Sequence, residues 1–460
     1  MSSDTLSRQV GQWAANVTYD QIPEYVREQA LLNILDAVGI AFASTHYDFA
    51  DKSIAAARAL GTGEHGAIAM PHKFTVRDQA MINGLLMHGL DFDDTHVAGV
   101  IHATVSALPT AIAVATDKQL SGQDLILGYL IGLEVSARVA SAADGGFHAA
   151  GFHPTGLVGA FGAATAAAAM LGLDAEGISQ AQGIVGSMAG GSLEFLETGA
   201  WTKRLHPGWA AFCGITAAEL ARAEFEGPPA IYEGRFGLFN NHTLPGHVVS
   251  PEMIVAGLGS VWELMNVAIK PYAACHFTHA CLDMAIELTV ENDLKPEDIA
   301  HVITIVPAQV VPVVCEPMQA KLIPRSDYDA KFSLPFIIGT AISRRRFTLM
   351  DLNDASLADP ITLELASKVD YEADPNPTFP KYFHGEVIIE TTDGRTLRKR
   401  EDVNRGAEGR PLSAAEVEQK FRDNMALVAN AEVTNRVFNA VMDLAKTANA
   451  RDFNEALRLS

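Results

Sequence analysis

Residues 155–173, TGLVGAFGAATAAAAMLGL, contain no charged side chain. The run is longer than a typical strand, and its many alanines and glycines suit close packing on several sides. His153 and Asp174 flank it, rather than the basic and aromatic residues that anchor membrane helices. We therefore predict a helix buried inside a helical domain, although this stretch is the nearest in the chain to a membrane span.

Similar apolar runs recur before and after this one. Most are too long for strands, are rich in alanine and leucine, and are separated by glycine, aspartate or proline. They cover residues 79–90, 104–116, 124–142, 177–189 and 208–224. Because the uncharged runs show no polar face, they predict an all-helical domain with several fully buried helices.

The pattern changes after Lys270. Residues 300–306 (AHVITIV) are β-branched and predict a strand. Residues 386–392 and 395–397 flank an Asp-Gly pair, which predicts a hairpin, and residues 333–342 between these segments predict a helix.

The helical pattern returns after Pro411, where Ser413 and Glu416 form a predicted capping box. The fold class is thus predicted to be mainly α with an α+β part. We expect a large helical domain over residues 1–268, a smaller α+β domain over 269–408, and C-terminal helices over 409–460 that rejoin the helical domain.

The composition narrows the classes of function. The 460 residues include 55 acidic and 34 basic side chains, giving a net charge of -21, which disfavours nucleic acid and membrane partners. The four cysteines form no Cys-x-x-Cys pair, so they predict neither a zinc ribbon nor an iron–sulfur cluster. No phosphate-binding loop, dinucleotide fingerprint or nucleophile elbow is present. Unclustered cysteines and a polar N-terminus predict a cytoplasmic protein.

Residues 91–102, DFDDTHVAGVIH, are the best single indication of an active site. Three carboxylates, a hydroxyl and two imidazoles lie between apolar segments. Buried sequence does not tolerate so many ionisable groups unless they are paired or used in chemistry. Carboxylates and imidazoles predict general acid–base catalysis. Structural caps are the alternative interpretation. The spacing lacks the rigid pattern of a metal site, so we predict no metal.

Three further segments are candidates for the same site. His153 precedes Pro154 at a predicted helix start, where the helix dipole would lower the imidazole pKa. Residues 202–208 (TKRLHPG) would place two cations and an imidazole ahead of a helix that starts near Pro207, as a carboxylate receptor. Residues 270–279 (KPYAACHFTH) fall at the predicted domain junction, where pockets are favoured.

Together these segments resemble the MmgE/PrpD family. The resemblance rests on HGLDFDDT at 88–95, GFHPT at 151–155, TKRLHPG at 202–208, KPY at 270–272 and AKFSLPF at 330–336. It implies a homodimer whose active site lies between a helical domain and a smaller lid, with no metal or organic cofactor. The family's activities are 2-methylcitrate dehydration, cis-aconitate decarboxylation and iminodisuccinate epimerisation, all proton transfers at carbon in small polycarboxylates.

The resemblance assigns roles to individual residues. Catalytic roles are expected for Asp91, His102, His153 and Lys203, and substrate contacts for Thr95, Arg204, His206, Lys270, Cys275 and His276. Within the first cluster, Asp93 and His96 are expected to be structural. The sequence departs from the decarboxylase pattern in a loop between Thr95 and His102 that is one residue longer, and in Cys275, which stands where a histidine is usual.

The sequence therefore predicts a cofactor-independent lyase of the 2-methylcitrate dehydratase type. It would remove the proton alpha to a carboxylate of a citrate-like acid. An epimerase of an iminodisuccinate-like acid and a cis-aconitate decarboxylase are the alternatives within the enzyme class. A binding or scaffold protein that retains the fold is the alternative outside it. Convergence of His102, His153 and Lys203 would favour an enzyme.

Overall fold

The computed structural model describes residues 4–375, 378–379 and 381–459, and the chain divides into two compact units. The larger unit contains the chain up to Phe195, residues 200–269 and the chain from Ser413 onward. The smaller unit contains residues 196–199 and 270–412. One division follows Ile269 and another follows Leu412, whereas the predicted boundaries are at residues 268 and 408. The predicted fold class is confirmed, because the chain is mainly helical and the smaller unit contains a mixed sheet.

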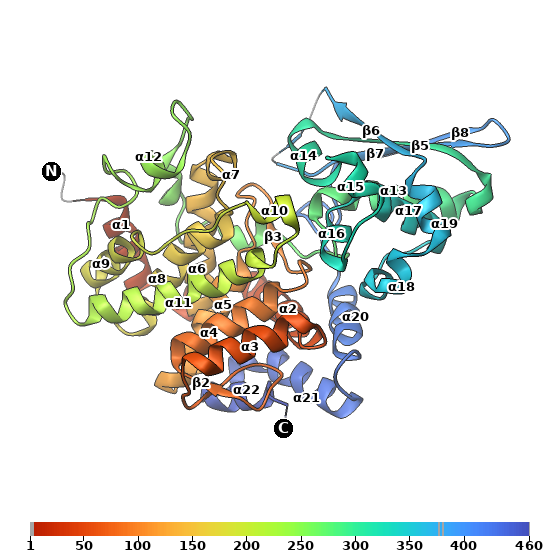
Figure 1. Ribbon diagram of the computed structural model, residues 1–460. Coiled ribbons are helices and arrows are strands. Elements are labelled where there is room, and N and C mark those ends of the chain that lie inside the picture. The colour runs from red at the N-terminus through yellow and green to blue at the C-terminus, as the bar shows by residue number, and fades with distance from the viewer. Residues whose placement is uncertain (1–3, 376–377, 380, 460) are drawn as a thin grey trace. The chain divides into compact units, whose positions relative to one another are not determined.

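The larger unit is built mainly from helices (Figure 1). They are α1 (Leu6–Asn16), α2 (Glu24–Ser44), α3 (Asp48–Leu60), α4 (Val76–His88), α5 (Thr104–Lys118), α6 (Gly122–Ala142), α7 (Gly146–Ala149), α8 (Pro154–Met170), α9 (Ala175–Val185), α11 (Thr202–Arg222) and α12 (Leu238–His242). Two antiparallel pairs of very short strands lie between them: β1 (His65–Gly66) with β2 (Lys73–Phe74), and β3 (Thr95–His96) with β4 (Val267–Ala268).

Helix α8 lies at the centre of the larger unit and contains most of the uncharged run. Pro154 occupies its first turn, where a missing backbone N–H costs nothing. Every residue of α8 up to Ala168 is buried, and α5, α6, α9 and α11 pack around it. A Cβ at Gly162 would collide with the carbonyl group of Gly132 on α6. The predicted buried helix is confirmed, and it lacks a polar face because neighbours surround it.

Helix α6, rather than α8, is long and apolar enough to be compared with a membrane span. Almost all of its apolar window is buried inside the larger unit, so its composition is that of a core helix. The expectation that residues 155–173 come nearest to a span is therefore wrong, because α8 ends at Met170 and is shorter than α6.

The chain returns to the larger unit through α20 (Ala414–Met425), α21 (Ala431–Met442) and α22 (Ala450–Ala456). The predicted capping box is confirmed, since Ser413 and Glu416 bond each other's backbone N–H groups. Helix α20 packs on α2, where the ring of Phe421 lies against Gly39 and leaves no room for a side chain there. The final helices thus complete the core that begins with α2.

The smaller unit is a four-stranded sheet packed on helices (Figure 1). The sheet order is β6 (Val369–Asp374), β5 (Ile299–Pro307), β7 (Gly385–Thr391) and β8 (Thr396–Glu401). Helices α13 (His279–Glu291) and α17 (Leu334–Arg344) pack against it, and α14 (Val311–Val314), α15 (Met318–Leu322), α16 (Asp327–Lys331), α18 (Asp354–Leu357) and α19 (Pro360–Ala366) connect its parts. The predicted strand, helix and hairpin are confirmed, whereas β6, parallel to β5, was not predicted.

Candidate active site

The acidic cluster lies on a buried loop between α4 and α5. Asp91 adopts a left-handed backbone conformation with φ 51°, which turns the chain sharply after α4 ends at His88. Strand β3 follows and pairs with β4. His96 and Ile101 then exchange two backbone hydrogen bonds of 2.7 and 3.3 Å. The loop is therefore a fixed turn inside the larger unit rather than a helical face.

Two cations hold this loop by its backbone. The Nζ of Lys420 on α20 donates a hydrogen bond of 2.7 Å to the carbonyl oxygen of Phe92 and lies 2.7 Å from a carboxylate oxygen of Asp36. The Nε of Arg204 donates a hydrogen bond of 2.8 Å to the carbonyl oxygen of Gly89. This contact gives Arg204 a structural task at the start of the loop, and its predicted contact with substrate stays a prediction.

Asp93 lies between two imidazoles. Its carboxylate oxygens are 2.9 and 3.0 Å from Nδ1 of His88, and one of them is 3.1 Å from Nδ1 of His102. Burial alone would raise the pKa of this carboxyl, but His102 and His88 outweigh burial and hold the pKa well below its usual value. Asp93 is thus an ionised acceptor shared by both rings. Asp93 orients two imidazoles of the cluster, and the expectation that it is structural stays a prediction.

The second ring nitrogen of His102, Nε2, faces the ion pair formed by the Asp91 carboxylate and the Lys203 ammonium group. Nδ1 of His102 also lies 3.0 Å from the carbonyl oxygen of Asp94. Because the neighbours of Nδ1 are oxygen acceptors, Nδ1 carries the proton and Nε2 can act as a base. Nε2 is 3.6 Å from Oδ1 of Asp91, and Nζ of Lys203 is 3.0 Å from that same oxygen. Three predicted catalytic residues therefore meet at one point.

His153 and His206 form a second imidazole pair. His153 caps α8, as predicted, and its backbone N–H donates a hydrogen bond of 2.9 Å to the carbonyl oxygen of Gly191. The two Nδ1 atoms of the pair lie 2.9 Å apart, so one donates and the other accepts. Burial and nearby positive charge lower the pKa of His153 well below its usual value, and burial lowers that of His206 to about 4. Both rings are neutral near pH 7.

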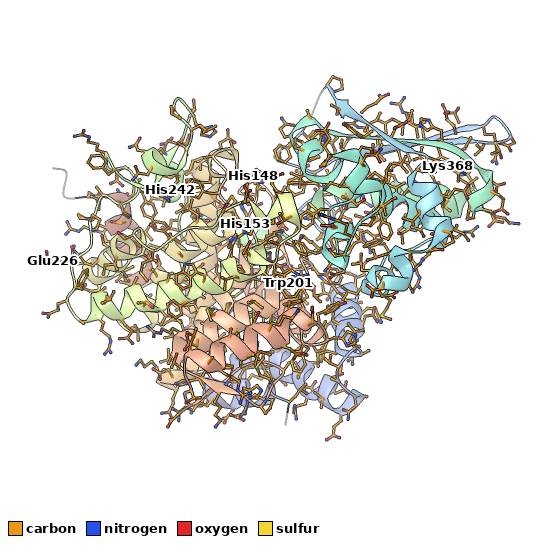
Figure 2. The ribbon with its side chains drawn as sticks, in the orientation of Figure 1. His148, His153, Trp201, Glu226, His242 and Lys368 are labelled. Atoms are coloured by element: carbon orange, nitrogen blue, oxygen red, sulfur yellow. The ribbon has the colours of Figure 1, made fainter. Side chains whose placement is uncertain are left out.

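The rings of His88, His102 and His153 converge in the interior of the larger unit; His153 is labelled in Figure 2. Ring centroids lie 4.5 Å apart for His88 and His102, 5.9 Å for His88 and His153, and 6.1 Å for His102 and His153. Donor atoms of the three side chains lie within 4.8 Å of one another. Such a group can exchange protons with a small ligand, and imidazole nitrogens also bind transition metals.

Asp94 and Thr95 have different surroundings from Asp93. Asn33, Thr104 and the backbone of Thr104 donate hydrogen bonds to the Asp94 carboxyl, and Tyr129 bonds the Thr104 hydroxyl. Burial nevertheless raises the pKa of Asp94 to about 6. This carboxyl joins α2 and α5 beneath the loop. The Thr95 hydroxyl is buried and has no hydrogen-bond partner among the described residues, as expected for a group that awaits a ligand.

The basic segment lies inside α11, not ahead of a helix as predicted. The helix begins at Thr202, and Pro207 falls in its second turn. Proline removes one backbone donor there, but the packing of α11 on α4 and α8 keeps the helix continuous. Lys203 and His206, three positions apart, share the buried face. His206 was predicted to bind substrate. In the structure its ring forms the hydrogen bond with His153 described above, and a contact with substrate stays a prediction.

The remaining predicted residues belong to the smaller unit. Lys270 is 1% exposed, and Cys275 and His276 are also buried. The backbone N–H of Cys275 donates a hydrogen bond of 2.8 Å to the carbonyl oxygen of Lys331, and Nε2 of His276 is 2.9 Å from the amide nitrogen of Asn404. Their contact with substrate stays a prediction.

Sequence reasoning missed His88 and Lys420. His88 ends an apolar run five residues before Asp93, so its position beside the cluster was a usable signal. Lys420 is 328 positions from the Phe92 carbonyl group that it binds, and no local pattern connects them. Only the return of α20 to the larger unit reveals that contact.

Comparison with known proteins gives matches along most of the chain. The MmgE/PrpD N-terminal domain matches residues 8–248, and the MmgE/PrpD C-terminal domain matches residues 272–444. The first match contains the imidazole cluster and Lys203. The second contains Cys275 and His276, and Lys270 falls between the two.

Several curated proteins align with this chain over 293 to 410 residues. Cis-aconitate decarboxylase of Homo sapiens is 30% identical over 380 residues, 79% of this chain and 76% of that protein. The Mus musculus enzyme of the same name is 28% identical over 410 residues, 85% and 80% of the two chains. Cis-aconitate decarboxylase of Aspergillus terreus is 29% identical over 293 residues, 61% and 59% of the two chains.

Proposed function

Because this chain belongs to the MmgE/PrpD family, we propose that it is a cofactor-independent lyase acting on a small polycarboxylate of the citrate or aconitate class. One observation carries the proposal: Nε2 of His102 and Nζ of Lys203 meet at the same Asp91 oxygen, at 3.6 and 3.0 Å. A base beside a cation is what proton transfer next to a carboxylate requires. A scaffold protein has no need for this convergence.

The proposed chemistry assigns each group a task. A substrate carboxylate displaces Asp91 from the Lys203 ammonium group, which stabilises the negative charge that develops on the carboxylate side of the reacting carbon. Nε2 of His102 then exchanges a proton with that carbon, while Asp93 fixes the ring through Nδ1. His153, neutral near pH 7, can accept a second proton on another face of the ligand. Thr95 supplies a hydroxyl donor.

Decarboxylation of cis-aconitate or a similar unsaturated acid is the first candidate reaction. It is supported by the names of the relatives, which are cis-aconitate decarboxylases. In that reaction the bond between carbon and one carboxylate breaks, carbon dioxide leaves, and the electron pair is taken up by a proton delivered to carbon. His102 in its protonated form is the proposed donor.

Dehydration of a 2-methylcitrate-like hydroxy acid is the second candidate. It is supported by the loop between Thr95 and His102, which is one residue longer than the decarboxylase pattern described above. His102 would take the alpha proton, and the hydroxyl group would leave as water with a proton from the protonated carboxyl of Asp91. Epimerisation uses the same opposed imidazoles on a single carbon, without loss of a leaving group.

Proton NMR in deuterated water separates these reactions. The chain is incubated separately with cis-aconitate, 2-methylcitrate, citrate and iminodisuccinate. Release of carbon dioxide with a deuterium label on carbon supports decarboxylation, and new vinyl signals from a saturated acid support dehydration. Deuterium entry without net conversion supports epimerisation. Absence of any exchange or conversion with all four acids would contradict the proposal.

Lys270, Cys275 and His276 are proposed to contact substrate as well, on the strength of the family pattern. Lys270→Met should then raise KM for the active acid more than it lowers kcat, because a carboxylate contact contributes to substrate binding. An unchanged KM would remove Lys270 from the binding site. Lys368→Met, at a half-buried lysine of the same unit that pairs with Glu364 and is labelled in Figure 2, is the matched control.

A second copy of this chain is the proposed partner. Trp201, just before α11, and Leu205 and Trp209 on α11 are spaced four positions apart. They are 39%, 39% and 40% exposed, and the first two border a groove of about 370 Å³. Exposed apolar stripes of this kind are typical of protein interfaces. Light scattering should give twice the mass of one chain, and Trp209→Glu should reduce it to one, whereas Leu244→Glu should not. A monomeric wild-type chain would contradict the dimer.

A further inference from the structure

Each of the three converging imidazoles uses Nδ1 for a hydrogen bond inside the protein. Nδ1 of His88 faces the Asp93 carboxylate, and Nδ1 of His102 faces the Asp94 carbonyl oxygen and the Asp93 carboxylate. Nδ1 of His153 faces His206. The atom that each ring can offer to a ligand is therefore Nε2. Histidines that bind metals almost always have the arrangement of His88 and His102, with the other nitrogen bonded to a carboxylate or carbonyl group. His153 offers Nε2 in the same way when its Nδ1 donates to His206.

The dimensions of the cluster are close to those of a three-histidine metal site. Zinc–nitrogen bonds of about 2.0–2.1 Å in a tetrahedron place the nitrogens about 3.3 Å apart. Donor atoms of His88, His102 and His153 already lie within 4.8 Å of one another. Shortening these separations by up to about 1.5 Å would close the set, which leaves a fourth position for water, as in zinc sites with three histidines.

His88 supplies an independent indication of a ligand. Its side chain is 1% exposed, and its Nε2 has no hydrogen-bond partner among residues 4–375, 378–379 and 381–459. A buried polar atom without a partner costs about 1–3 kcal/mol, so such atoms are rare unless something else satisfies them. Nδ1 of the same ring is fixed on Asp93, so this ring cannot turn Nε2 towards an acceptor without losing that bond.

We propose that His88, His102 and His153 form a binding site for a divalent transition-metal ion of the Zn²⁺ or Co²⁺ type, and that the ion inhibits the enzyme. The metal would occupy the lone pair of His102 that proton transfer needs. The binding site stands on the three imidazoles alone, whereas inhibition rests on the proposed lyase function. The metal is an inhibitor here and takes no part in the reaction.

The contacts of the neighbouring carboxylates favour a metal site of three imidazoles over a site that also uses carboxylate ligands. Asp91, with Asp93, His88 and His102, belongs to a second group of converging donors. Lys203 already lies 3.0 Å from the Asp91 carboxylate, and two imidazoles share that of Asp93. Both carboxylates would have to give up these contacts to bind a metal. The positive charge of Lys203 also weakens the binding of a metal ion nearby. The expected affinity for the metal is therefore moderate, and chelators are expected to remove the metal from the site.

Cobalt titration of the full chain tests the site without reference to activity. Tetrahedral Co²⁺ bound through nitrogen absorbs visible light, and one equivalent should saturate this absorption. One equivalent of Zn²⁺ should abolish it by displacement. His88→Gln keeps an amide donor for Asp93 but removes the imidazole, so it should weaken Co²⁺ binding at least about tenfold. His153→Ala should do the same, and His46→Ala, which removes an exposed imidazole, should not.

The outcomes separate metal binding from the lyase function. No visible absorption in the wild-type chain, or full binding by both His88→Gln and His153→Ala, would overturn the metal site. If His88→Gln fails to fold by circular dichroism, the wild-type stoichiometry and His153→Ala still decide the question. Saturable binding with inhibition of turnover, reversed by a chelator, supports both parts. Saturable binding with no turnover of any polycarboxylate would leave the site standing and refute the lyase.

Discussion

Asp93 and Asp94 are adjacent, fully buried carboxyls in opposite electrostatic settings. The imidazoles of His102 and His88 hold the pKa of Asp93 low, whereas burial raises that of Asp94 to about 6. Asp93→Asn removes a charge that orients two rings and should lower kcat by about 100-fold, within the range typical of general-base catalysis. Asp94→Asn resembles the protonated carboxyl and keeps the backbone carbonyl group that His102 uses. It should lower kcat much less.

Steady-state kinetics of the two variants, compared at equal folded fraction, checks this expectation. Equal losses of kcat in both variants would show that disruption of the loop, and not removal of the Asp93 charge, lowers kcat. Sequence alone could not rank these neighbours. Both are aspartates in one motif, and their difference arises from His88 on one side and from Asn33 and Thr104 on the other.

At the scale of elements, α8 depends on small residues where it meets α6. Gly162→Ala would push a methyl group into the Gly132 carbonyl group. Overpacking of this kind costs about 1–3 kcal/mol, so the melting temperature of the larger unit should fall. Gly61→Ala is the matched control, because nothing lies within 4 Å of its Cβ position and its backbone is extended. Calorimetry of the two variants decides; equal stability would show that α6 and α8 can separate freely.

Helix α20 is expected to contribute to catalysis by holding the loop through Lys420. Lys420→Met leaves the Asp36 carboxyl buried without its ammonium group, which typically costs about 3–5 kcal/mol, and frees the Phe92 carbonyl group. Adding Asp36→Asn should restore much of the stability but not the kcat, because the Phe92 contact is still missing. Thermal denaturation and kinetics of the single and double variants check this. Recovery of kcat together with stability would show that Lys420 acts on folding alone.

Element types were largely predictable, whereas their contacts were not. The apolar runs predicted α5, α6 and α8 because uncharged helices have a distinctive composition. The start of α11 was missed because Pro207 favours a helix start locally, and packing on α4 and α8 overrides that preference. Strand β6 was missed since its residues, VDYEAD, are polar and lie on a sheet edge.

At the scale of the whole molecule, buried acids make stability depend on pH. Burial raises the pKa of Glu134 to about 7 despite its contact with Arg138. The folded state therefore binds this proton more tightly than the unfolded state, and stability falls as pH rises from about 4.5 to 7. Glu134→Gln removes this titration. Its free energy of unfolding relative to wild type should rise by on the order of 2 kcal/mol between pH 5 and 8.

Calorimetry of wild type and Glu134→Gln across this pH range tests the sign. Parallel curves would mean that Glu134 keeps an ordinary pKa in the folded state. Glu134 is a suitable probe because it lies on α6 and bonds the backbone of Leu264, outside the imidazole cluster.

The candidate site combines local motifs with contacts that only the fold creates. Asp91, His102, His153 and Lys203 could be predicted because each belongs to a short segment whose composition is unusual for a core. Their convergence could not, since it depends on how α8 and α11 pack against the loop.

Deuterium exchange at carbon is the most direct measurement of the central claim that His102 transfers a proton to or from a polycarboxylate. Wild-type chain and His102→Asn, compared in deuterated water with the acid that is turned over, should differ sharply by proton NMR. The wild type is expected to introduce solvent deuterium at the carbon beside a carboxylate, and His102→Asn, folded by circular dichroism, is expected not to. Equal labelling by both proteins would contradict it.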